Sequence, residues 1–498
     1  MKLYNTRSRM IEEFVPNNKD VVTLYTCGPT VYHFAHIGNL RTYIMEDVLE
    51  KALNFVGYNV KRVMNITDVG HLTSDGDTGE DKMLKGAKRE HKSVMDIAKY
   101  YTDCFKEDCN KLNIKWPETV IPATSMIDYY INFIEELIKK GYAYFANGNV
   151  YFDTSKLKDY YVLSNHVLDD LMEGVREGVS IDSNKKNKND FVLWFTKSKF
   201  DSQELKWDSP WGLGYPGWHI ECSCISIKYL GEYLDIHCGG VDNIFPHHTN
   251  EIAQAESYLG HKWGDYWFHT EHLNDSTGKM SKSKGEFLTV SLLKEKGYNP
   301  LSYRFLCLQS HYRKQMIFTF ESLDIAENAY KKLLNRVANL KNNGVVDKNI
   351  KEMYITKFKE TLEDDLNTSN SLTVLYEVLK SDINDATKRE LVLEFDKVLS
   401  LDLMKSNTND VDYNKKKYIQ EMIEKRELAK REKNYVLADE IRNKLNEEGI
   451  VLKDTREGTI YEVIKWEDDV CGLWLIYYNK LDYSINWFFD YFSITSIY

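Results

Sequence analysis

The chain has 498 residues, 43% of them hydrophobic and 28% charged, and its formal net charge at pH 7 is -11. At roughly 150 residues per domain, this length corresponds to about three globular domains. A disulfide-stabilised secreted scaffold is excluded, because eight cysteines without regular spacing in so long a chain are typical of reduced thiols or metal ligands. Residues 1–10 hold no signal peptide and no apolar run approaches the ~20 residues that span a bilayer, so we expect a cytoplasmic protein that binds no membrane.

The first part of the chain has the pattern of a nucleotide-binding α/β unit. The β-branched run at 21–24 predicts a buried strand, the apolar spacing at 41–55 predicts an amphipathic helix, and a glycine-containing turn joins them. A second strand is expected at 60–66, followed by a loop rich in Gly and Asp and by helices up to residue 111 and at 125–140. Strand, glycine turn and helix in this order open a Rossmann-like parallel sheet.

An insertion is expected to interrupt this sheet. Residues 142–152 contain Asn147-Gly148 between aromatic and β-branched residues, which predicts a hairpin, and residues 155–190 are polar and irregular. Residues 212–217 fit the G-x-G-x-x-G expression but follow no strand, so we do not interpret them as a dinucleotide loop. The sheet is expected to resume near Trp207, with strands at 234–237 and 266–269 and a helix at 246–259 between them.

The rest of the chain is almost entirely helical in pattern. Residues 321–340 and 357–401 predict a helical bundle, and residues 413–448 predict a last helical pair that ends at Gly449, a favourable C-cap. The Lys- and Arg-rich run at 415–433 is compatible both with a local RNA-binding face and with a solvated helix stabilised by ion pairs. The aromatic-rich residues 466–498 receive no role from the sequence.

Cysteine, histidine and glutamate side chains form a candidate metal site. His247 and Glu251 lie four residues apart, so a helix would place both on one face. Together with Cys222 and Cys27 they give four ligands suited to tetrahedral zinc. Because no Cys-x-x-Cys pair is present, the spacing is equally compatible with buried structural side chains. The alternative ligands are Cys224, Cys238 and His248.

Two further segments have the chemistry of phosphate binding. The run His36–Asn39 (His-Ile-Gly-Asn) lies at an expected helix N-terminus, where free N–H groups and the helix dipole attract anions. Lys279 and Lys282 flank small residues in a loop that could close on a triphosphate. Taken alone, the first segment is also compatible with a plain helix start and the second with a solvated loop.

In combination, these segments resemble a known family. His-Ile-Gly-Asn at 36–39 and Lys-Met-Ser-Lys-Ser at 279–283 are similar to the two signatures of class I aminoacyl-tRNA synthetases. The segments at 25–32, 217–222 and 235–248, together with Asn-Ile-Thr-Asp at 65–68, narrow the resemblance to the cysteinyl-tRNA synthetases, over residues 1 to about 465. The resemblance implies ATP-dependent activation of L-cysteine to cysteinyl-AMP with release of pyrophosphate, and transfer to the 3′ end of the cysteine tRNA in protein synthesis.

The resemblance also implies cofactors, partners and site residues. It implies one Zn2+ per chain, Mg2+ with ATP, and a monomer that binds tRNA, ATP and L-cysteine. The implied metal ligands are Cys27, Cys222, His247 and Glu251, and the implied cysteine-binding residues are Cys27, Thr67 and Trp218. The implied ATP-binding residues are His36, Gly38, Asn39, Asp242, Lys279 and Lys282, of which His36, Lys279 and Lys282 would be catalytic. The implied tRNA anticodon contacts are Tyr435, Asp439 and Asp454.

The same resemblance gives each segment an expected identity. The fold expected is an α/β protein with a Rossmann-like catalytic domain, an inserted connective domain, and a helical bundle followed by an anticodon-binding region. The expected limits are 1–115 with 205–272 for the catalytic domain, 116–204 for the insertion, 273–320 for the Lys-Met-Ser-Lys-Ser loop region, 321–405 for the bundle, 412–465 for the anticodon region and 466–498 for the tail.

The chain also departs from the family's pattern. Residues 70–80 form an expected loop insertion, Cys238 stands where glycine is usual, and Tyr435 replaces the usual Trp. Lys284 and Glu286 replace the usual Leu and Asn after the second signature. Two other functions remain as alternatives: a relative that ligates activated cysteine to an amino sugar, which would not need an anticodon module, and a non-catalytic RNA-binding paralogue, against which the intact site residues argue.

Overall fold

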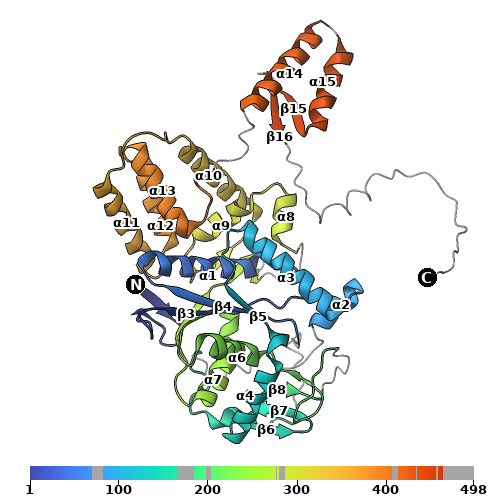
Figure 1. Ribbon diagram of the computed structural model, residues 1–498, viewed down its shortest axis with the longest axis vertical. Coiled ribbons are helices and arrows are strands. Elements are labelled where there is room, and N and C mark those ends of the chain that lie inside the picture. The colour runs from blue at the N-terminus through green and yellow to red at the C-terminus, as the bar shows by residue number, and fades with distance from the viewer. Residues whose placement is uncertain are drawn as a thin grey trace, which may run out of the picture. The chain divides into compact units, whose positions relative to one another are not determined.

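The computed structural model describes residues 1–69, 82–164, 184–197, 204–275, 278–279, 287–405, 413–432, 434–455 and 458–463. The chain forms two compact units, Met1–Met404 and Lys405–Tyr498 (Figure 1). Several expected features lie outside the described residues: the loop insertion at 70–80, Lys282 with the rest of its loop, and the aromatic tail. Among the described residues, no helix combines the length and the apolarity that crossing a bilayer requires.

A five-stranded parallel sheet forms the centre of the first unit. Its strand order is β11-β10-β3-β4-β5. The central strand β3, the first of these five in the sequence, pairs with β10 on one side and with β4 on the other. The strands are β3 (Val22–Thr26), β4 (Val60–Ile66), β5 (Thr119–Pro122), β10 (Leu234–Gly240) and β11 (Gly264–Thr270). Because the order reverses between β3 and β10, the carboxyl ends of these two strands open a crevice in which ligands bind in open α/β sheets.

Helices cover both faces of this sheet. Helix α1 (Ile37–Val56) lies on one face, and α6 (His219–Leu230) and α7 (Thr249–Leu259) lie on the other (Figure 1). Side chains of a strand point alternately to the two faces. In β3, Val22 and Leu24 therefore join the core under α1, whereas Tyr25 and the following Cys27 join the core beside α6.

The helices expected between the second strand and residue 111 are present. Two helices, α2 (Lys82–Glu90) and α3 (Val94–Lys111), follow β4, and α3 starts at the N-cap Ser93, whose hydroxyl accepts from the backbone N–H of Asp96. An N-terminal hairpin was not predicted. Its strands are β1 (Lys2–Asn5) and β2 (Met10–Glu13).

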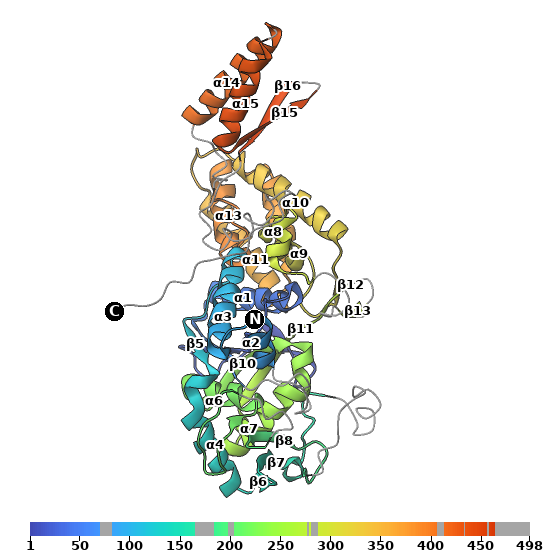
Figure 2. The same cartoon turned by 90° about the vertical axis from the view of Figure 1, so that its right-hand side faces the viewer.

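The insertion lies beyond α6 and α7 at one end of the first unit, in both views (Figures 1 and 2). The predicted helix and hairpin are present in it. Its elements are η1 (Ala123–Met126), α4 (Ile127–Lys139), β6 (Ala143–Ala146), β7 (Asn149–Phe152), η2 (Thr154–Lys156), β8 (Phe191–Phe195) and β9 (Tyr215–Pro216), and the four strands form one antiparallel sheet in that order.

Two strands fall across the expected limits of the insertion at 116 and 204. β5 belongs to the parallel sheet although it lies after residue 116, and β9 pairs with β8 although it lies after residue 204. The G-x-G-x-x-G segment contains β9, and a Cβ on Gly214 would lie 2.1 Å from the carbonyl oxygen of Phe195. This glycine therefore permits close strand packing.

Helices dominate the remainder of the first unit. The turns η3 (Val241–Asn243) and η4 (Ile244–His248) lead into α7, and short strands β12 (Leu273–Asp275), β13 (Gly278–Lys279) and β14 (Met316–Ile317) form a small sheet. The helices are α8 (Val290–Glu295), α9 (Pro300–Leu308), α10 (Phe320–Ala338), α11 (Lys348–Glu363), α12 (Thr368–Lys380) and α13 (Asp385–Leu399). The bundle predicted at 321–340 and 357–401 is formed by α10 to α13.

The second unit contains the predicted helical pair and a hairpin that was not predicted. The expectation of an almost entirely helical C-terminal half is wrong here. The elements are α14 (Tyr413–Arg431), α15 (Tyr435–Glu447), β15 (Ile450–Thr455) and β16 (Gly458–Val463). Gly449 ends the helical part with φ 75°, and Ile419, Ile441 and Leu452 pack the helices and the hairpin into one small core.

Candidate active site

The candidate site lies at the carboxyl edge of the parallel sheet, where the strand order reverses. β3 ends at Thr26, so Cys27 is the first residue beyond it, and the backbone N–H of Cys27 donates to the carbonyl of Cys238 in β10 (3.4 Å). Helix α6 begins at His219 on the same edge and brings Cys222 to Cys27. The turn between β10 and α7 brings His247 and Glu251 to the same point.

These four side chains form a compact, fully buried cluster. Their ligand atoms all lie within 4.8 Å of one another. The two sulfurs are 3.8 Å apart, Cys222 Sγ lies 3.6 Å from His247 Nε2, and Glu251 Oε1 lies 3.0 Å from His247 Nε2 and 3.9 Å from Cys27 Sγ. Zinc bonds of about 2.0–2.3 Å in tetrahedral geometry place ligand atoms roughly 3.3–3.8 Å apart, so the cluster has the dimensions and the donor types of a zinc site.

A second group of potential ligands overlaps the first. In the described part of the chain, Cys27 and Glu251 also form such a group with His237 and His248. Of the alternative ligands considered from the sequence, His248 therefore lies at the site. Cys224 and Cys238 belong to neither group, and Cys238 packs in the core under α1, on the opposite face of the sheet.

Burial determines the protonation of the cluster. Desolvation, with the neighbouring Cys222 thiol, raises the pKa of Cys27 well above its usual value, and desolvation raises the pKa of Cys222 to about 11. Desolvation lowers the pKa of His247 to about 3, so its imidazole is neutral at pH 7. A neutral imidazole is a ligand, and a bound divalent cation supplies the positive charge that two buried thiolates need. The residues present thus fit a metal ion.

Polar residues on β4 and α6 form one wall beside the cluster. Thr67 Oγ1 donates to Glu221 Oε2 (2.6 Å) and accepts from Asn65 Nδ2 (3.1 Å). Trp218 is half-buried, and its ring stacks on His247 with the ring centroids 4.0 Å apart and an interplanar angle of 2°. The structure therefore brings both predicted cysteine-pocket residues, Thr67 and Trp218, next to the metal cluster.

The sequence reasoning missed Glu221 as a member of this wall. Glu221 is buried, and its second carboxylate oxygen, Oε1, has no hydrogen-bond partner among the described residues. Desolvation raises its pKa well above the usual value. Its position directly before Cys222 was no clear signal, because consecutive helix residues point about 100° apart, and only the folded structure shows that Glu221 reaches Thr67.

One predicted phosphate-binding segment, His36–Asn39, lies at the start of α1. His36 is the N-cap, and its Nδ1 accepts from the backbone N–H of Gly38 (3.0 Å). The ring of His36 also packs edge-on against Phe287, with centroids 5.3 Å apart. Asn39 is exposed on the first turn of α1, and Asp242 is exposed in the turn after β10. Only the backbone of Lys279 is described, and Lys282 lies outside the described residues.

The predicted anticodon residues lie in the second unit. Tyr435 at the first turn of α15 is 62% exposed, and Asp439 is exposed on the same helix. Asp454 accepts from both Nη atoms of Arg426 (2.9 and 3.0 Å) and from Lys430 (3.0 Å). These hydrogen bonds hold the pKa of Asp454 well below its usual range. Asp454 is thus already hydrogen-bonded within the unit, whereas Tyr435 is largely exposed.

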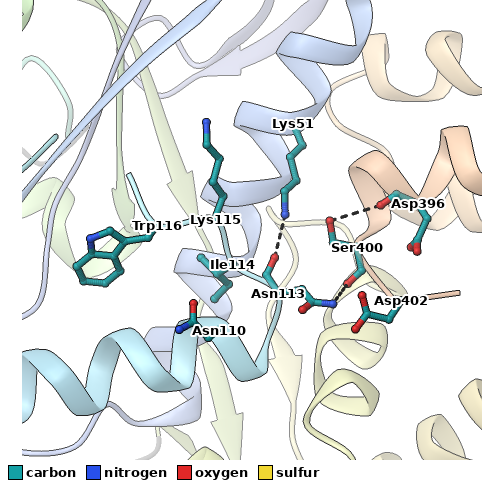
Figure 3. Close-up of a pocket in the computed structure, with 9 residues that line it drawn as sticks. All are labelled: Lys51, Asn110, Asn113, Ile114, Lys115, Trp116, Asp396, Ser400 and Asp402. Atoms are coloured by element: carbon teal, nitrogen blue, oxygen red, sulfur yellow. Dashed lines mark hydrogen bonds between the residues drawn. The ribbon is translucent and has the colours of Figure 1, made fainter. Parts of the chain in front are cut away.

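A separate cavity of about 400 Å³ lies between α1, the end of α3 and the end of α13 (Figure 3). None of the predicted site residues lines it. Lys51 Nζ donates to the carbonyl of Asn113 (2.8 Å), and Asn113 Nδ2 donates to the carbonyl of Ser400 (3.1 Å). These hydrogen bonds between lining residues connect the helices around the cavity. The cavity is therefore part of the packing between helices and not of the candidate site.

Comparisons with known proteins agree with this geometry. Residues 13–328 match the family model described as tRNA synthetases class I (C) catalytic domain, and residues 357–425 match the DALR domain. The chain is 46% identical to a cysteine–tRNA ligase of Treponema denticola over 93% of this chain and 99% of that one, and 45% identical to one of Borrelia garinii over 92% and 98%.

A solved structure supports the fold. The methionyl-tRNA synthetase of Mycobacterium tuberculosis bound by methionyl-adenylate has a TM-score of 0.51 and 14% sequence identity, over 76% of this chain and 90% of that chain. At this identity the likeness concerns the fold alone, which is the Rossmann-like sheet with helical C-terminal parts. The identity to the cysteine–tRNA ligases extends over nearly the whole of both chains. The chain therefore belongs to the cysteine–tRNA ligase family of class I aminoacyl-tRNA synthetases.

Proposed function

We propose that this protein is a cysteine–tRNA ligase that activates L-cysteine with ATP and transfers it to the cysteine tRNA. The observation that carries the proposal is the meeting of Cys27, Cys222, His247 and Glu251 at the carboxyl edge of the sheet, in a chain whose helix α1 starts with the His36–Asn39 segment. The carboxylate of cysteine attacks the α-phosphorus of ATP, pyrophosphate leaves, and a ribose hydroxyl of the tRNA 3′ end then attacks the carbonyl and displaces AMP.

The buried cluster selects the amino acid. A pocket that reads shape alone separates near-isosteres such as cysteine and serine by only about a hundredfold. We propose that Cys27, Cys222, His247 and Glu251 hold one Zn2+. When bound, this ion supplies a soft, positively charged contact that a thiolate satisfies far better than a hydroxyl. Trp218 and Thr67 would enclose the rest of the amino acid.

The start of α1 binds ATP in this proposal. The dipole of α1 favours the phosphates, and Gly38 lets them approach the backbone. His36 lies at the N-cap, so its imidazole faces the same position. We further assign Asn39 and Asp242 to ATP, and Lys279 and Lys282 to the charge that develops on the phosphates, with Mg2+ on the leaving pyrophosphate.

The second unit reads the tRNA in this proposal. Tyr435 and its neighbours Val436 and Leu437 are exposed apolar side chains at the start of α15, and aromatic rings can stack on unpaired bases. Asp439 and Asp454 would complete this surface. The expected division into a catalytic domain split by a connective insertion, with β5 counted to the catalytic domain and β9 to the insertion, and the monomeric state remain part of this proposal.

One experiment tests the activity and the metal together. ATP–pyrophosphate exchange should depend on cysteine, should discriminate against serine by more than the roughly hundredfold of a shape-reading pocket, and should fall on removal of zinc by a chelator. Charging of the cysteine tRNA should follow. Exchange that survives complete removal of the metal would contradict the zinc assignment, and absence of cysteine-dependent exchange would contradict the function.

Helix α6 offers a matched pair of variants for the same assay. Cys222 and Cys224 are both buried and two residues apart, but only Cys222 belongs to a metal group in the described residues. We expect Cys222→Ser to lower zinc affinity by more than about a hundredfold and to abolish exchange, because the effect of losing a ligand exceeds the 10–100-fold effect of losing an outer-shell partner. Cys224→Ser should keep stoichiometric zinc.

A further inference from the structure

A chain of buried side chains runs from the cluster to the N-terminal hairpin. Cys27 Sγ lies 3.3 Å from His248 Nε2, His248 Nδ1 lies 2.8 Å from His269 Nε2, and His269 Nδ1 lies 2.7 Å from Thr6 Oγ1. All four residues are at most 9% exposed. Nothing in the activation chemistry described above uses His248, His269 or Thr6.

The packing holds the middle of this chain in one orientation. The ring of His248 lies between His237, Trp267 and His269, with ring centroids 4.4, 5.3 and 4.9 Å away. On β10, Gly239 leaves room for it, because a Cβ there would lie 2.7 Å from His248 Cε1. The ring therefore cannot turn away from Cys27 without displacing its neighbours.

Hydrogen-bond chemistry allows this chain two directions. A neutral imidazole donates from one nitrogen and accepts at the other, so both histidines must point the same way. If Cys27 is a thiolate, it can only accept, and the direction is fixed: Thr6 donates to His269, His269 donates to His248, and His248 donates to the sulfur. The hydroxyl of Thr6 can donate or accept, so it satisfies the end of the chain in either direction.

We propose that Thr6, His269 and His248 are positioning residues that supply an N–H···S hydrogen bond to Cys27 and so tune it as a metal ligand in cysteine recognition. This inference rests on the proposed function. The bond withdraws negative charge from the Cys27 sulfur, which leaves the metal better able to accept a further thiolate from the substrate. It also assigns His248 as a hydrogen-bond donor, and thereby favours the group with Cys222 and His247 over the group with His237 and His248.

The other ligands have partners of the same kind, which supports this reading. His237 Nε2 lies 2.7 Å from Glu251 Oε2, and His219 Nδ1 lies 3.0 Å from His247 Nδ1. Outer-shell hydrogen bonds orient metal ligands and commonly change metal affinity by 10–100-fold. The hydrogen bonds from Cys27 differ, because they continue from His248 through His269 to the hydroxyl of Thr6 in the N-terminal hairpin.

The test uses the full-length protein with Thr6→Val and Thr6→Ser. Valine has the shape of threonine but can neither donate nor accept, whereas serine keeps the hydroxyl. Zinc affinity is measured by competition with a chromophoric chelator, and the thiolate-to-metal charge-transfer band is measured after loading with Co2+. We expect Thr6→Val to weaken zinc binding about tenfold and to shift the band, and to raise the KM for cysteine without changing the KM for ATP.

Three controls keep the test decisive. Thr6→Ser should match the wild type in zinc affinity and in the charge-transfer band. Ser8→Ala should do so too, because it removes a hydroxyl of the same hairpin that is not part of the hydrogen-bonded series from Thr6 to Cys27. His269→Phe should reproduce the Thr6→Val shift. A Thr6→Val protein with wild-type affinity and band would overturn the inference. A wild type that binds metal but activates no cysteine would instead overturn the proposed function and leave the hydrogen-bonded chain intact.

Discussion

Individual side chains in the site owe their properties to burial more than to their neighbours in sequence. Cys27 and Cys238 both lie close to the carboxyl edge of the sheet, and desolvation raises the pKa of each thiol. Only Cys27 faces α6, because the two lie on opposite faces of the sheet. The thiol of Cys238, which the sequence left as an alternative ligand, is therefore packed under α1, away from the four-residue cluster.

A buried carboxyl far from the site gives a pH-dependent prediction at this scale. Asp108 on α3 is 4% exposed, its nearest cation among the described residues is Lys111 at 3.9 Å, and desolvation raises its pKa to about 6. Because the folded state holds this proton more tightly than the unfolded state, Asp108 favours folding below about pH 4, and that contribution is lost as the pH rises through 6.

Asp108→Asn should therefore raise the free energy of unfolding at pH 7–8 by about 1–3 kcal/mol, and the gain should vanish below about pH 4. Urea unfolding at several pH values measures the difference. Asp103→Asn, an exposed position on the same helix, should change stability by no more than about 0.5 kcal/mol. A gain for Asp108→Asn that is the same at pH 4 and pH 8 would refute the explanation.

At the scale of elements, one ion pair connects the sheet's first helix to the helical region. Asp47 of α1 accepts from Arg304 of α9 (2.7 Å), from Lys51 (2.7 Å) and from the backbone N–H of Lys115 (2.7 Å). Arg304 also donates to the carbonyls of Leu112, at the end of α3, and Leu399, at the end of α13. Four helices thus meet at two fully buried charges, and Lys51, which bonds Asp47, also lines the cavity of Figure 3.

Asp47→Asn should destabilise the protein by about 3–5 kcal/mol, because it leaves the buried guanidinium of Arg304 without its counter-charge. Glu107→Gln is the matched control: Glu107 pairs with Lys111 at 2.6 Å on an exposed helix face, and such pairs contribute about 0–1 kcal/mol. Thermal and urea unfolding of both variants give the comparison. An equal decrease in the free energy of unfolding for the two variants would show that burial does not determine how much these ion pairs stabilise the protein.

At the scale of the whole molecule, the division into two units separates the proposed site of the chemistry from the proposed tRNA-reading surface. All the proposed metal, cysteine and ATP residues belong to Met1–Met404, and all the proposed anticodon contacts belong to Lys405–Tyr498. The family matches follow a similar order, with the catalytic domain at 13–328 and the DALR domain at 357–425. Amino-acid activation and tRNA reading should therefore be separable.

A chain truncated after Met404 should keep cysteine-dependent ATP–pyrophosphate exchange within a few-fold of the full chain but should lose most charging of tRNA. Circular dichroism and a thermal melt would first establish that the truncated chain is folded. Tyr435→Ala in the full chain should weaken charging without affecting exchange, because loss of a stacked base costs about 1–3 kcal/mol. Full charging by the truncated chain would remove the tRNA role from the second unit.

The sequence by itself indicated the family and the order of most helices and strands, and through the resemblance it implied the four metal ligands, which the structure brings together as one of two groups that could hold a metal. Those features follow from short-range patterns and from the resemblance of the motifs, so they need no knowledge of which strands pair. The hairpin β15–β16 and the N-terminal hairpin escaped prediction because short strands of mixed polarity leave a weak periodic signal.

Only the tertiary structure decided which side chains meet. Sequence spacing could not separate His248 from Cys238 as alternative ligands, but the strand order places His248 at the cluster and Cys238 on the far face. It likewise brings Thr6 and His269 into line with Cys27, although they come from three separate segments. The physical reason is that sheet pairing and the alternation of strand faces are properties of the folded chain, and a single sequence does not specify the pairing order.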